Sequence, residues 1–560
     1  MAENGLDPEH PTGIMTQIVR RTLIVPLALA AVAAPAFAQE SSGTSAVEAP
    51  ARYEEDRPSP EFHRGRREAV LAALPEDAVG ILVSSPRRLR SNDVDYQYRQ
   101  SNSLYYLTGM TEPATVLILV PGGADVDGRQ VREILVVPER DPATESWNGR
   151  RFGAERAGDE LGVEIAVGAS RLEEVLDPLL ETRRAFVLPW PDGVAQGSDL
   201  ASQLAYLRDR IPVLEVAPGR AGFAQRAMLR VEDDTAYDRF RGVLDRMGGV
   251  GATAGTEAAD MTRAFVEAGS ADAWMAWKDK NLAEYADAVL LESVLTDLRE
   301  VKTDEEMRFL QEAIDITVAA HREAFRSIEP GLREYEIEAV IEYVFHREGA
   351  EYPGFPSIVG SGENSVILHY ESNRRRMEDG DLVVMDIGAE YRGYSADVTR
   401  TVPVNGRFSE PQRLIYESVL EAQEAAIEAA QPGAGLQTVN AVASAVLANR
   451  LVELGIIADP SGLRRYFPHG VSHYLGLDVH DTGTYGPLRP GSVITVEPGI
   501  YIPPTEGVDE RWWNIGVRIE DDVLVTEDGP VVLSVAAPKS IHEIEQMMAE
   551  PGLASANVGE

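Results

Sequence analysis

The sequence of 560 residues contains no cysteine. This absence excludes disulfide bonds, thiolate nucleophiles and cysteine-ligated zinc. Any metal site in the chain therefore has to be built from carboxylate and imidazole side chains.

Positive charge is scarce as well. The chain has 52 Lys and Arg residues against 91 Asp and Glu residues, for a net charge of -39. A surface of that sign repels phosphate backbones, so we expect no nucleic acid partner. The excess carboxylates fit either a solvated surface or groups gathered around cations, and composition does not separate the two. With 44% hydrophobic residues, the chain is otherwise typical of a globular protein of two or three domains.

Familiar hydrolase and nucleotide signatures are also missing. The sequence has no His-Glu-x-x-His, no Gly-x-Ser-x-Gly and no Gly-x-x-x-x-Gly-Lys-Ser/Thr motif. The segment Gly249-Val250-Gly251 is superficially similar to a dinucleotide-binding loop. It follows a helical stretch and not a strand, so we interpret it as a helix end and a loop.

The N-terminus has the pattern of an export signal. Arg20 and Arg21 precede the apolar run Thr22–Ala34, which is short for a membrane span, and Ala36-Phe37-Ala38 follows as a small-residue cleavage site. We therefore expect residues 1–38 to be a signal peptide and the protein to be exported, to the periplasm in a Gram-negative host. An uncleaved anchor or a buried helix of a cytoplasmic protein is the alternative. No later segment is apolar enough to cross a membrane, so we expect no stable membrane insertion after signal removal.

Composition and periodicity divide the rest of the chain. Short apolar strand-like runs alternate with helical spacing from Pro58 onward, which predicts an α/β domain with a buried sheet. Thr303-Asp-Glu-Glu306 is a capping box, and two rounds of helices followed by strands come after it, which suggests a pseudo-duplicated α+β domain. The predicted segments are a flexible leader (39–57), the N-terminal α/β domain (58–224), a helical insertion or linker (225–302), the α+β domain (303–548) and a disordered tail (549–560).

Acidic residues stand inside or beside apolar strands of this second domain. They are Asp386, Asp397, Glu497 and Glu520, and His473 belongs to a histidine-rich segment nearby. Each one alone could occupy a turn or an exposed strand end. Four carboxylates in buried strands of one domain need cations between them, and two divalent ions are the natural solution.

These segments closely resemble the aminopeptidase P (Xaa-Pro aminopeptidase) family of the pita-bread, creatinase/aminopeptidase-like metallopeptidases. The resemblance runs from about Pro58 to Glu550, and residues 225–300 look longer than the family core needs. Further segments that carry it are Ile358–Tyr370 with His369, Tyr96–Asn102, Tyr106–Met110 and Trp147–Arg150. The family's metal ligands match Asp386, Asp397, His473, Glu497 and Glu520, and its substrate-side histidines match His369, His469 and His480.

The resemblance implies a mechanism. Asp397 and Glu520 would bridge two ions, with Asp386 on one side and His473 and Glu497 on the other, and a bridging hydroxide would be the nucleophile. The oxygen-rich ligand set suits Mn²⁺, with Co²⁺ or Zn²⁺ as alternatives. His369 and His480 would hydrogen-bond the substrate carbonyl or the oxyanion, and Glu497 would also carry a proton. Arg518, on the substrate side, could orient Asp386, and the alternative is an ordinary surface arginine.

Three functions are compatible with these residues. The first is an Xaa-Pro aminopeptidase that releases the N-terminal residue of peptides with proline second; the second is an Xaa-Pro dipeptidase (prolidase) with the same metal chemistry. The third is a non-catalytic binding protein of the pita-bread fold, which the intact ligand set disfavours. The segments of the N-terminal domain favour the first. We expect a homo-oligomer.

The export signal predicts a mature N-terminus near Gln39, because signal peptidase cleaves after a small-residue pattern such as Ala36-Phe37-Ala38. N-terminal sequencing of the native protein measures this. An intact Met1 or Met15 in the cytoplasmic fraction would contradict export.

Overall fold

A computed structural model of the chain describes residues 56–553, except 196–197, 215–218, 232, 254–257, 283–284, 286 and 288. The predicted signal peptide, most of the predicted leader and residues 554–560 of the predicted tail lie outside the described residues. Within the described part of the chain, no helix is both long and apolar enough to cross a membrane.

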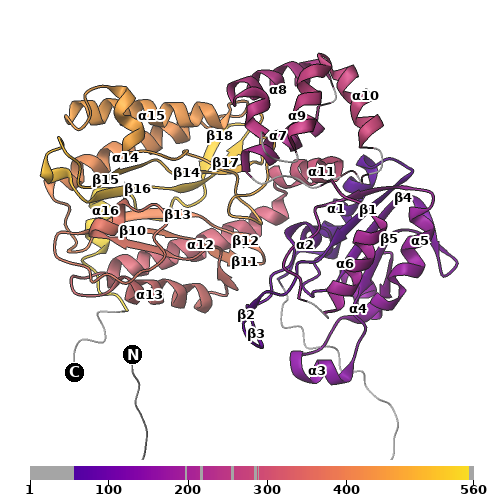
Figure 1. Cartoon of the computed structure of the whole chain (residues 1–560). Helices are drawn as coiled ribbons and strands as arrows, with labels where there is room; N and C mark the ends of the chain where they lie inside the picture. The colour runs from indigo at the N-terminus through magenta and orange to yellow at the C-terminus, as the bar shows by residue number, and fades with distance from the viewer. Residues whose placement is uncertain are drawn as a thin grey trace, which may run out of the picture. The chain divides into compact units, whose positions relative to one another are not determined.

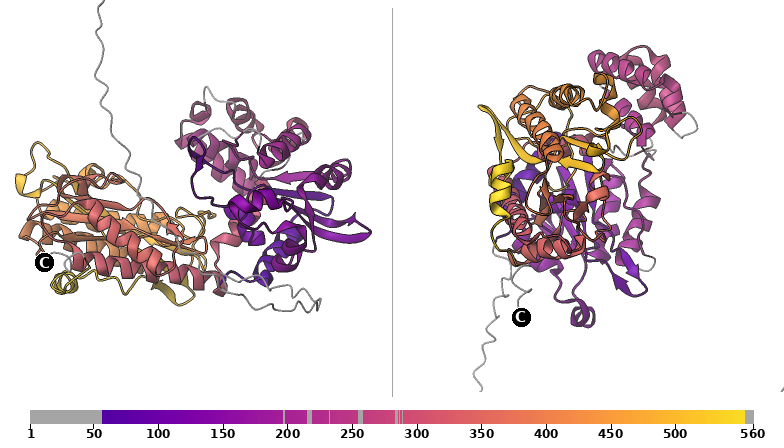
Figure 2. Two further views of the ribbon diagram at one scale, coloured as in Figure 1. Left: turned by 90° about the horizontal axis from the view of Figure 1, so that it is seen from below. Right: turned by 90° about the vertical axis from the view of Figure 1, so that its left-hand side faces the viewer.

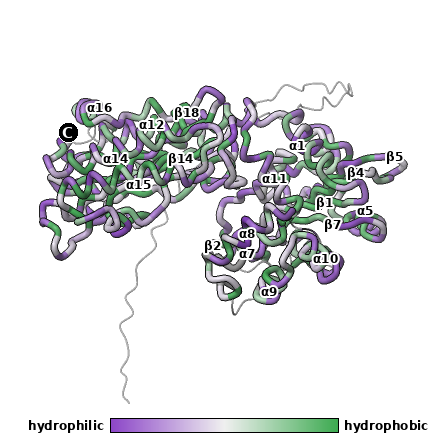
Figure 3. Tube along the Cα trace, turned by 90° about the horizontal axis from the view of Figure 1, so that it is seen from above, coloured by the Kyte–Doolittle hydropathy of each residue, from purple (hydrophilic) through white to green (hydrophobic). Residues whose placement is uncertain are grey.

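The N-terminal domain is built on a mixed sheet of five strands in the order β6-β5-β4-β1-β7. The strands are β1 (Ala78–Val83), β4 (Val116–Val126), β5 (Arg129–Val137), β6 (Ile165–Gly168) and β7 (Arg184–Val187), and β2 (Leu89–Ser91) and β3 (Val94–Asp95) form a separate hairpin. The helices are α1 (Pro60–Ala73), α2 (Asn102–Thr108), α3 (Pro142–Asn148), α4 (Gly153–Leu161), α5 (Leu172–Leu180) and α6 (Asp199–Arg210), with the 3-10 turn η1 (Ala169–Arg171) before α5. The predicted α/β domain is confirmed, and its central strands form an apolar core (Figure 3).

The next segment is helical, as predicted. It contains α7 (Gly219–Leu229), α8 (Asp234–Arg246), η2 (Gly249–Thr253), α9 (Ala258–Ala268), α10 (Ala271–Asn281) and α11 (Val289–Glu300). Trp274 and Phe265 are fully buried in a small core of their own, and the indole of Trp274 donates a hydrogen bond to the carbonyl of Met228 at 2.8 Å. Gly249–Gly251 lies in the turn η2 after a helix, so the context of a dinucleotide-binding loop is absent there.

The second domain repeats one sequence of elements, two helices and then strands. The first round contains α12 (Asp304–Ser327), α13 (Glu334–Arg347), β8 (Tyr352–Pro353), β9 (Ile358–Ser361), η3 (Gly362–Val366), β10 (Leu382–Ile387), β11 (Ala389–Tyr391), β12 (Tyr394–Ser395) and β13 (Val398–Pro403). The second contains α14 (Glu410–Ala429), α15 (Leu436–Glu453), η4 (Pro460–Arg465), β14 (Val493–Val496), β15 (Gly499–Ile502), η5 (Glu510–Trp512), β16 (Ile515–Arg518), β17 (Asp521–Thr526), β18 (Gly529–Val532) and α16 (Ile541–Met547). The strands lie between the pair α12–α13 and the pair α14–α15 (Figures 1 and 2).

The helix start predicted from the capping box at Thr303 is confirmed. At α12, Glu306 accepts the backbone N–H of Thr303 at 2.9 Å, and Thr303 Oγ1 accepts the N–H of Glu306 at 3.3 Å. The same reciprocal pair, Ser409 and Gln412, opens α14. Each box satisfies backbone donors that the first turn of a helix leaves unpaired.

The strands β10 and β13 bring the first two aspartates together. They pair antiparallel, with Asp386 opposite Thr399, so Asp397 lies immediately before the paired segment. Gly388 makes the close approach possible, because a Cβ atom there would lie 1.8 Å from the carbonyl oxygen of Ala396. A small hairpin, β11–β12, occupies the connection between the two strands.

Candidate metal centre

Asp386 and Asp397 form one side of a buried cluster. Asp386 is the penultimate residue of the apolar strand β10 and is 9% exposed, and Asp397 precedes β13 and is 5% exposed. Burial, together with the charge of Asp386, raises the pKa of Asp397. The backbone N–H of Asp397 donates to Asp522 at 3.2 Å, which fixes the chain at this point.

His473 and Glu497 approach from the second round of elements. The Nε2 atom of His473 lies 3.4 Å from Asp397 Oδ2 and 3.7 Å from Glu497 Oε1. The Nδ1 atom of His473 lies 3.0 Å from the carbonyl oxygen of Tyr474, which can only accept, so Nδ1 carries the proton. The lone pair of Nε2 therefore faces the carboxylates, as a metal ligand requires.

Glu520 closes the cluster from the turn between β16 and β17. It is 2% exposed, and the hydroxyl of Thr399 donates to its Oε2 atom at 2.7 Å. Its backbone N–H donates to the carbonyl of Thr399 at 3.0 Å. One atom each of Asp397, His473 and Glu520 lies within 4.8 Å of the others, a geometry that can hold a metal ion.

The carboxylates repel one another. Burial, reinforced by the charges of Asp397 and Asp386, raises the pKa of Glu497 to about 8. Burial and the neighbouring carboxylates also raise the pKa of Asp397 and of Glu520 well above their ordinary values. One oxygen of Asp386, Oδ1, is buried without a hydrogen-bond partner in the protein. Oxygen and imidazole donors gathered in this way fit divalent cations, which would satisfy both the charge and the unpaired oxygen.

A chain of hydrogen bonds leads from Asp386 to His469. The buried guanidinium of Arg518 donates to Asp386 Oδ2 at 2.6 Å and to the hydroxyl of Tyr501 at 3.0 Å. The Nδ1 atom of His469 lies 2.8 Å from the carbonyl of Gly470, so its Nε2 atom accepts from the Tyr501 hydroxyl at 2.9 Å. The predicted pairing of Arg518 with Asp386 is confirmed, whereas a contact of Arg518 with substrate stays a prediction.

The remaining histidines lie at the exposed edge of the cluster. The rings of His473 and His480 stack with their centroids 3.9 Å apart. Burial lowers the pKa of His469 to about 4, and partial burial of its ring lowers the pKa of His480 to about 4 as well. The side chains of His369 and His480 are accessible to solvent. At neutral pH, His469 and His480 are therefore neutral imidazoles.

Several residues behind the cluster have no local signal in the sequence. Thr399 and Tyr501 bind Glu520 and Arg518 through their hydroxyl groups, and Asp522 holds the backbone of Asp397. Arg400 is fully buried and donates all five of its N–H groups, to the side chain of Asp521 and to the carbonyls of Thr399, Glu520, Ala537 and Pro538. The flanking segment Ser395–Thr401 contains two of these residues, but their partners follow only from the fold.

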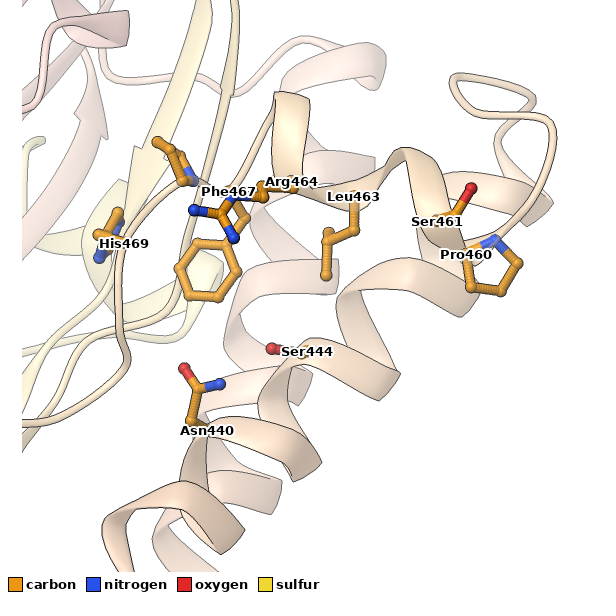
Figure 4. A pocket seen from close by; sticks show the side chains of 9 residues that line it. Asn440, Ser444, Pro460, Ser461, Leu463, Arg464, Phe467 and His469 are labelled. Carbon is orange, nitrogen blue, oxygen red and sulfur yellow. The ribbon is translucent and has the colours of Figure 1, made fainter. Parts of the chain in front are cut away.

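A groove of about 330 Å³ lies beside His469, between α15 and η4 (Figure 4). His469 also lies 3.6 Å from Glu497, so it borders both the groove and the carboxylate cluster. The guanidinium of Arg464 is an exposed cation at this groove. The groove is lined by Asn440, Ser444, Pro460, Ser461, Leu463, Arg464, Phe467, Pro468 and His469.

Comparison with known proteins identifies both domains. Residues 308–527 match the model of metallopeptidase family M24, and residues 63–188 match the N-terminal domain of aminopeptidase P. The Xaa-Pro aminopeptidase of Escherichia coli is 35% identical over 500 residues, which cover 87% of this chain and 97% of the relative. Human Xaa-Pro aminopeptidase 3 is 30% identical, with 87% of this chain and 85% of the relative covered.

Solved structures agree with the sequence matches. An aminopeptidase of Pseudomonas aeruginosa superimposes with a TM-score of 0.69 at 32% identity, covering 88% of this chain and 99% of that chain. Aminopeptidase P of Escherichia coli with the inhibitor Pro-Leu gives a TM-score of 0.68 at 33% identity, with the same coverage. The α/β N-terminal domain and the pita-bread second domain are thereby confirmed.

The repulsion among the carboxylates predicts how the stability of chelator-treated protein depends on pH. The folded-state pKa of Glu497, about 8, lies above its ordinary 4.5, so the folded state binds the proton more readily than the unfolded state. Stability should therefore rise as pH falls through about 8, until the unfolded state also takes up the proton. Protein saturated with a divalent ion should show a shallower dependence, since the ion replaces the protons.

Calorimetric melting temperatures across this pH range, with and without the ion, measure the effect. The variant Glu497→Gln is the matched control, and it should flatten the pH dependence of the chelated protein. A melting temperature of chelated protein that stays constant or falls over the same range would contradict the electrostatic argument.

Proposed function

The chain belongs to the Xaa-Pro aminopeptidases of metallopeptidase family M24, and we propose that it releases the N-terminal residue from peptides whose second residue is proline. One observation supports the proposal most directly. The buried cluster of carboxylates and His473 has an unpaired oxygen and mutually raised pKa values, which fits divalent cations and disfavours a protein that only binds peptides. The relatives of similar length are named for this activity.

We propose that Asp386, Asp397, His473, Glu497 and Glu520 would hold two divalent ions, with Asp397, His473 and Glu520 at the centre of the ligand set. Their donors are oxygen-rich and contain no thiolate, so Mn²⁺ is the ion we propose, with Co²⁺ and Zn²⁺ as substitutes. A related structure of aminopeptidase P from Escherichia coli is described as zinc-substituted. When bound, such ions supply the Lewis acidity that activates water and polarises a carbonyl at neutral pH.

The chain's own residues position the substrate and move the proton. Glu497 is more exposed than Asp386 or Asp397, with a side chain 19% exposed, so it is the carboxylate we propose as the proton carrier. Neutral His480 can donate one hydrogen bond to the scissile carbonyl, where negative charge develops. His369, at the same face, supplies a second such contact.

Proline in the second position is recognised by its shape. Its nitrogen carries no hydrogen, and its ring fixes the direction of the peptide after the scissile bond. Apolar contacts with the ring are worth about 1–3 kcal/mol, or roughly 10–200-fold in discrimination. A larger preference requires the ring to set the geometry of the carbonyl, which raises kcat.

The groove beside His469 supports activity on peptides longer than two residues. The free amine of the substrate lies at the carboxylate cluster, so the chain beyond proline has to extend away from it. His469 borders both places, and exposed Arg464 offers a positive charge to a terminal carboxylate. We therefore propose an aminopeptidase in preference to a strict dipeptidase.

We also propose that the protein is exported and that it assembles with copies of itself. The pattern Arg20, Arg21 and Ala36-Phe37-Ala38 supports export. The exposed side chain of Trp147 on α3, 87% accessible, is the kind of apolar group that subunit contacts bury.

Substrate choice tests the proposed function. Enzyme loaded with Mn²⁺ should cleave an Xaa-Pro peptide at least about tenfold faster than the matching Xaa-Ala peptide, measured as kcat/KM. His369→Ala should lower kcat while metal content stays normal, because His369 contacts the carbonyl and not the ions. Equal rates on the two peptides would refute the proline specificity, and loss of an ion from His369→Ala would make that residue a ligand.

The kcat/KM of chelated enzyme after reloading with Mn²⁺, Co²⁺ or Zn²⁺ ranks the three ions.

Peptide length tests the groove. Arg464→Ala should lower kcat/KM on an Xaa-Pro-Ala tripeptide by about two- to fivefold, the worth of one exposed ion pair. The same variant should leave kcat/KM unchanged on an Xaa-Pro dipeptide and on the amide of the tripeptide. The neighbouring Arg465, which stacks on Tyr466 and does not line the groove, gives the matched control Arg465→Ala. A wild-type enzyme that cleaves dipeptides alone would be a prolidase.

A further inference from the structure

The segment that carries His480 is held by Arg299, which lies outside residues 308–527, the part of the chain that matches metallopeptidase family M24. Arg299, in the last turn of α11, donates to Asp478 Oδ2 at 2.8 Å and to Asp481 Oδ1 at a shorter distance. These two aspartates flank His480 in the chain. One guanidinium therefore fixes the backbone on both sides of the histidine.

The pairing is buried, so its geometry is restricted. The side chains of Arg299, Asp481 and Lys302 are 7%, 1% and 1% exposed. Lys302 Nζ lies 3.4 Å from the second oxygen of Asp481, and the backbone N–H of Thr482 donates to the first at 2.9 Å. Buried charges are stable only where each finds its partner, so Asp481 has little freedom to move.

Neighbouring contacts extend this attachment along the same segment. Glu300, fully buried beside Arg299, accepts the backbone N–H of Thr484 at 2.6 Å. The backbone N–H of Lys302 donates to the carbonyl of Gly491 at 2.9 Å. The end of α11 and Lys302, two residues after it, thus hold the segment both at His480 and downstream of it.

The N-terminal domain holds the segment upstream of His480. Arg99 and Asn102 both donate to the carbonyl of Leu477, at 2.8 and 3.1 Å. Arg99 also pairs with Glu390 at 2.7 Å. The segment is therefore attached on both sides by residues that precede the second domain.

We propose that Arg299 is a positioning residue for catalysis: it fixes Asp478 and Asp481 so that the imidazole of His480 lies stacked on His473, ready to contact the substrate carbonyl. This gives the C-terminal end of the helical segment 225–302 a role in the reaction. Arg299 does not touch substrate and acts through His480. The inference rests on the proposed function, because His480 has this contact only in an enzyme of that activity.

A double-mutant cycle on the full chain tests the proposal. In the wild-type background, Arg299→Gln should lower kcat on an Xaa-Pro peptide by about tenfold, with a smaller change in KM, the size of a coupling between directly linked residues. In the His480→Ala background, the same substitution should lower kcat by less than about twofold, because the group that it positions is gone. Arg299→Lys should recover part of the rate.

The control is Arg489→Gln, which removes a 2.9 Å ion pair with Glu300 on the same helix but no contact to the residues beside His480. It should leave kcat within about twofold of wild type while lowering the melting temperature.

If Arg299→Gln does not fold, Asp478→Asn replaces it in the double-mutant cycle, because this variant removes only the half-exposed partner of Arg299. If the fold-losses of kcat caused by Arg299→Gln and His480→Ala multiply in the double variant, the two residues act independently and the inference is wrong. A wild-type enzyme without activity on Xaa-Pro peptides would instead refute the proposed function.

Discussion

Buried negative charge is the constraint on which the second domain depends. Asp386, Asp397 and Glu520 lie at the ends of apolar strands, where an uncompensated carboxylate is costly. Arg518 compensates Asp386 directly, and Arg400 neutralises Asp521 while binding the backbone that carries Glu520. The two arginines therefore hold the strands in register as well as balancing charge, and the carboxylates that they leave unpaired face one another.

Burial also determines the protonation state of His469 and His480 beside the cluster. Carboxylates alone would favour the charged imidazolium, yet desolvation prevails at His469 and His480 and keeps both neutral. A neutral imidazole has one donor and one acceptor, so the hydrogen bonds of His469 determine its tautomer. The neutral imidazoles of His469 and His480 thus add no positive charge beside the anionic cluster.

The local sequence predicts those structural elements that depend on residues close together in the chain. The apolar residues around Asp386 and the reciprocal side chains of Thr303 and Glu306 are enough to place a strand and a helix start. Tyr501 and Arg299 could not be predicted in this way, because their partners lie outside their local sequence: Arg518 and His469 are 17 and 32 residues from Tyr501, and Asp481 is 182 residues from Arg299. Such pairs arise from tertiary packing, and a single sequence contains no periodicity that reports them.

The attachment of the His480 segment to α11 bears on the modularity of the protein. A polypeptide trimmed to the M24 match would keep every proposed metal ligand and both exposed histidines. It would nevertheless leave Asp481 as a buried anion without its cations and the carbonyl of Leu477 without its donors. The second domain is thus not a self-sufficient module, and recombination that exchanges the first half of such a chain has to preserve the end of α11 together with the segment it holds.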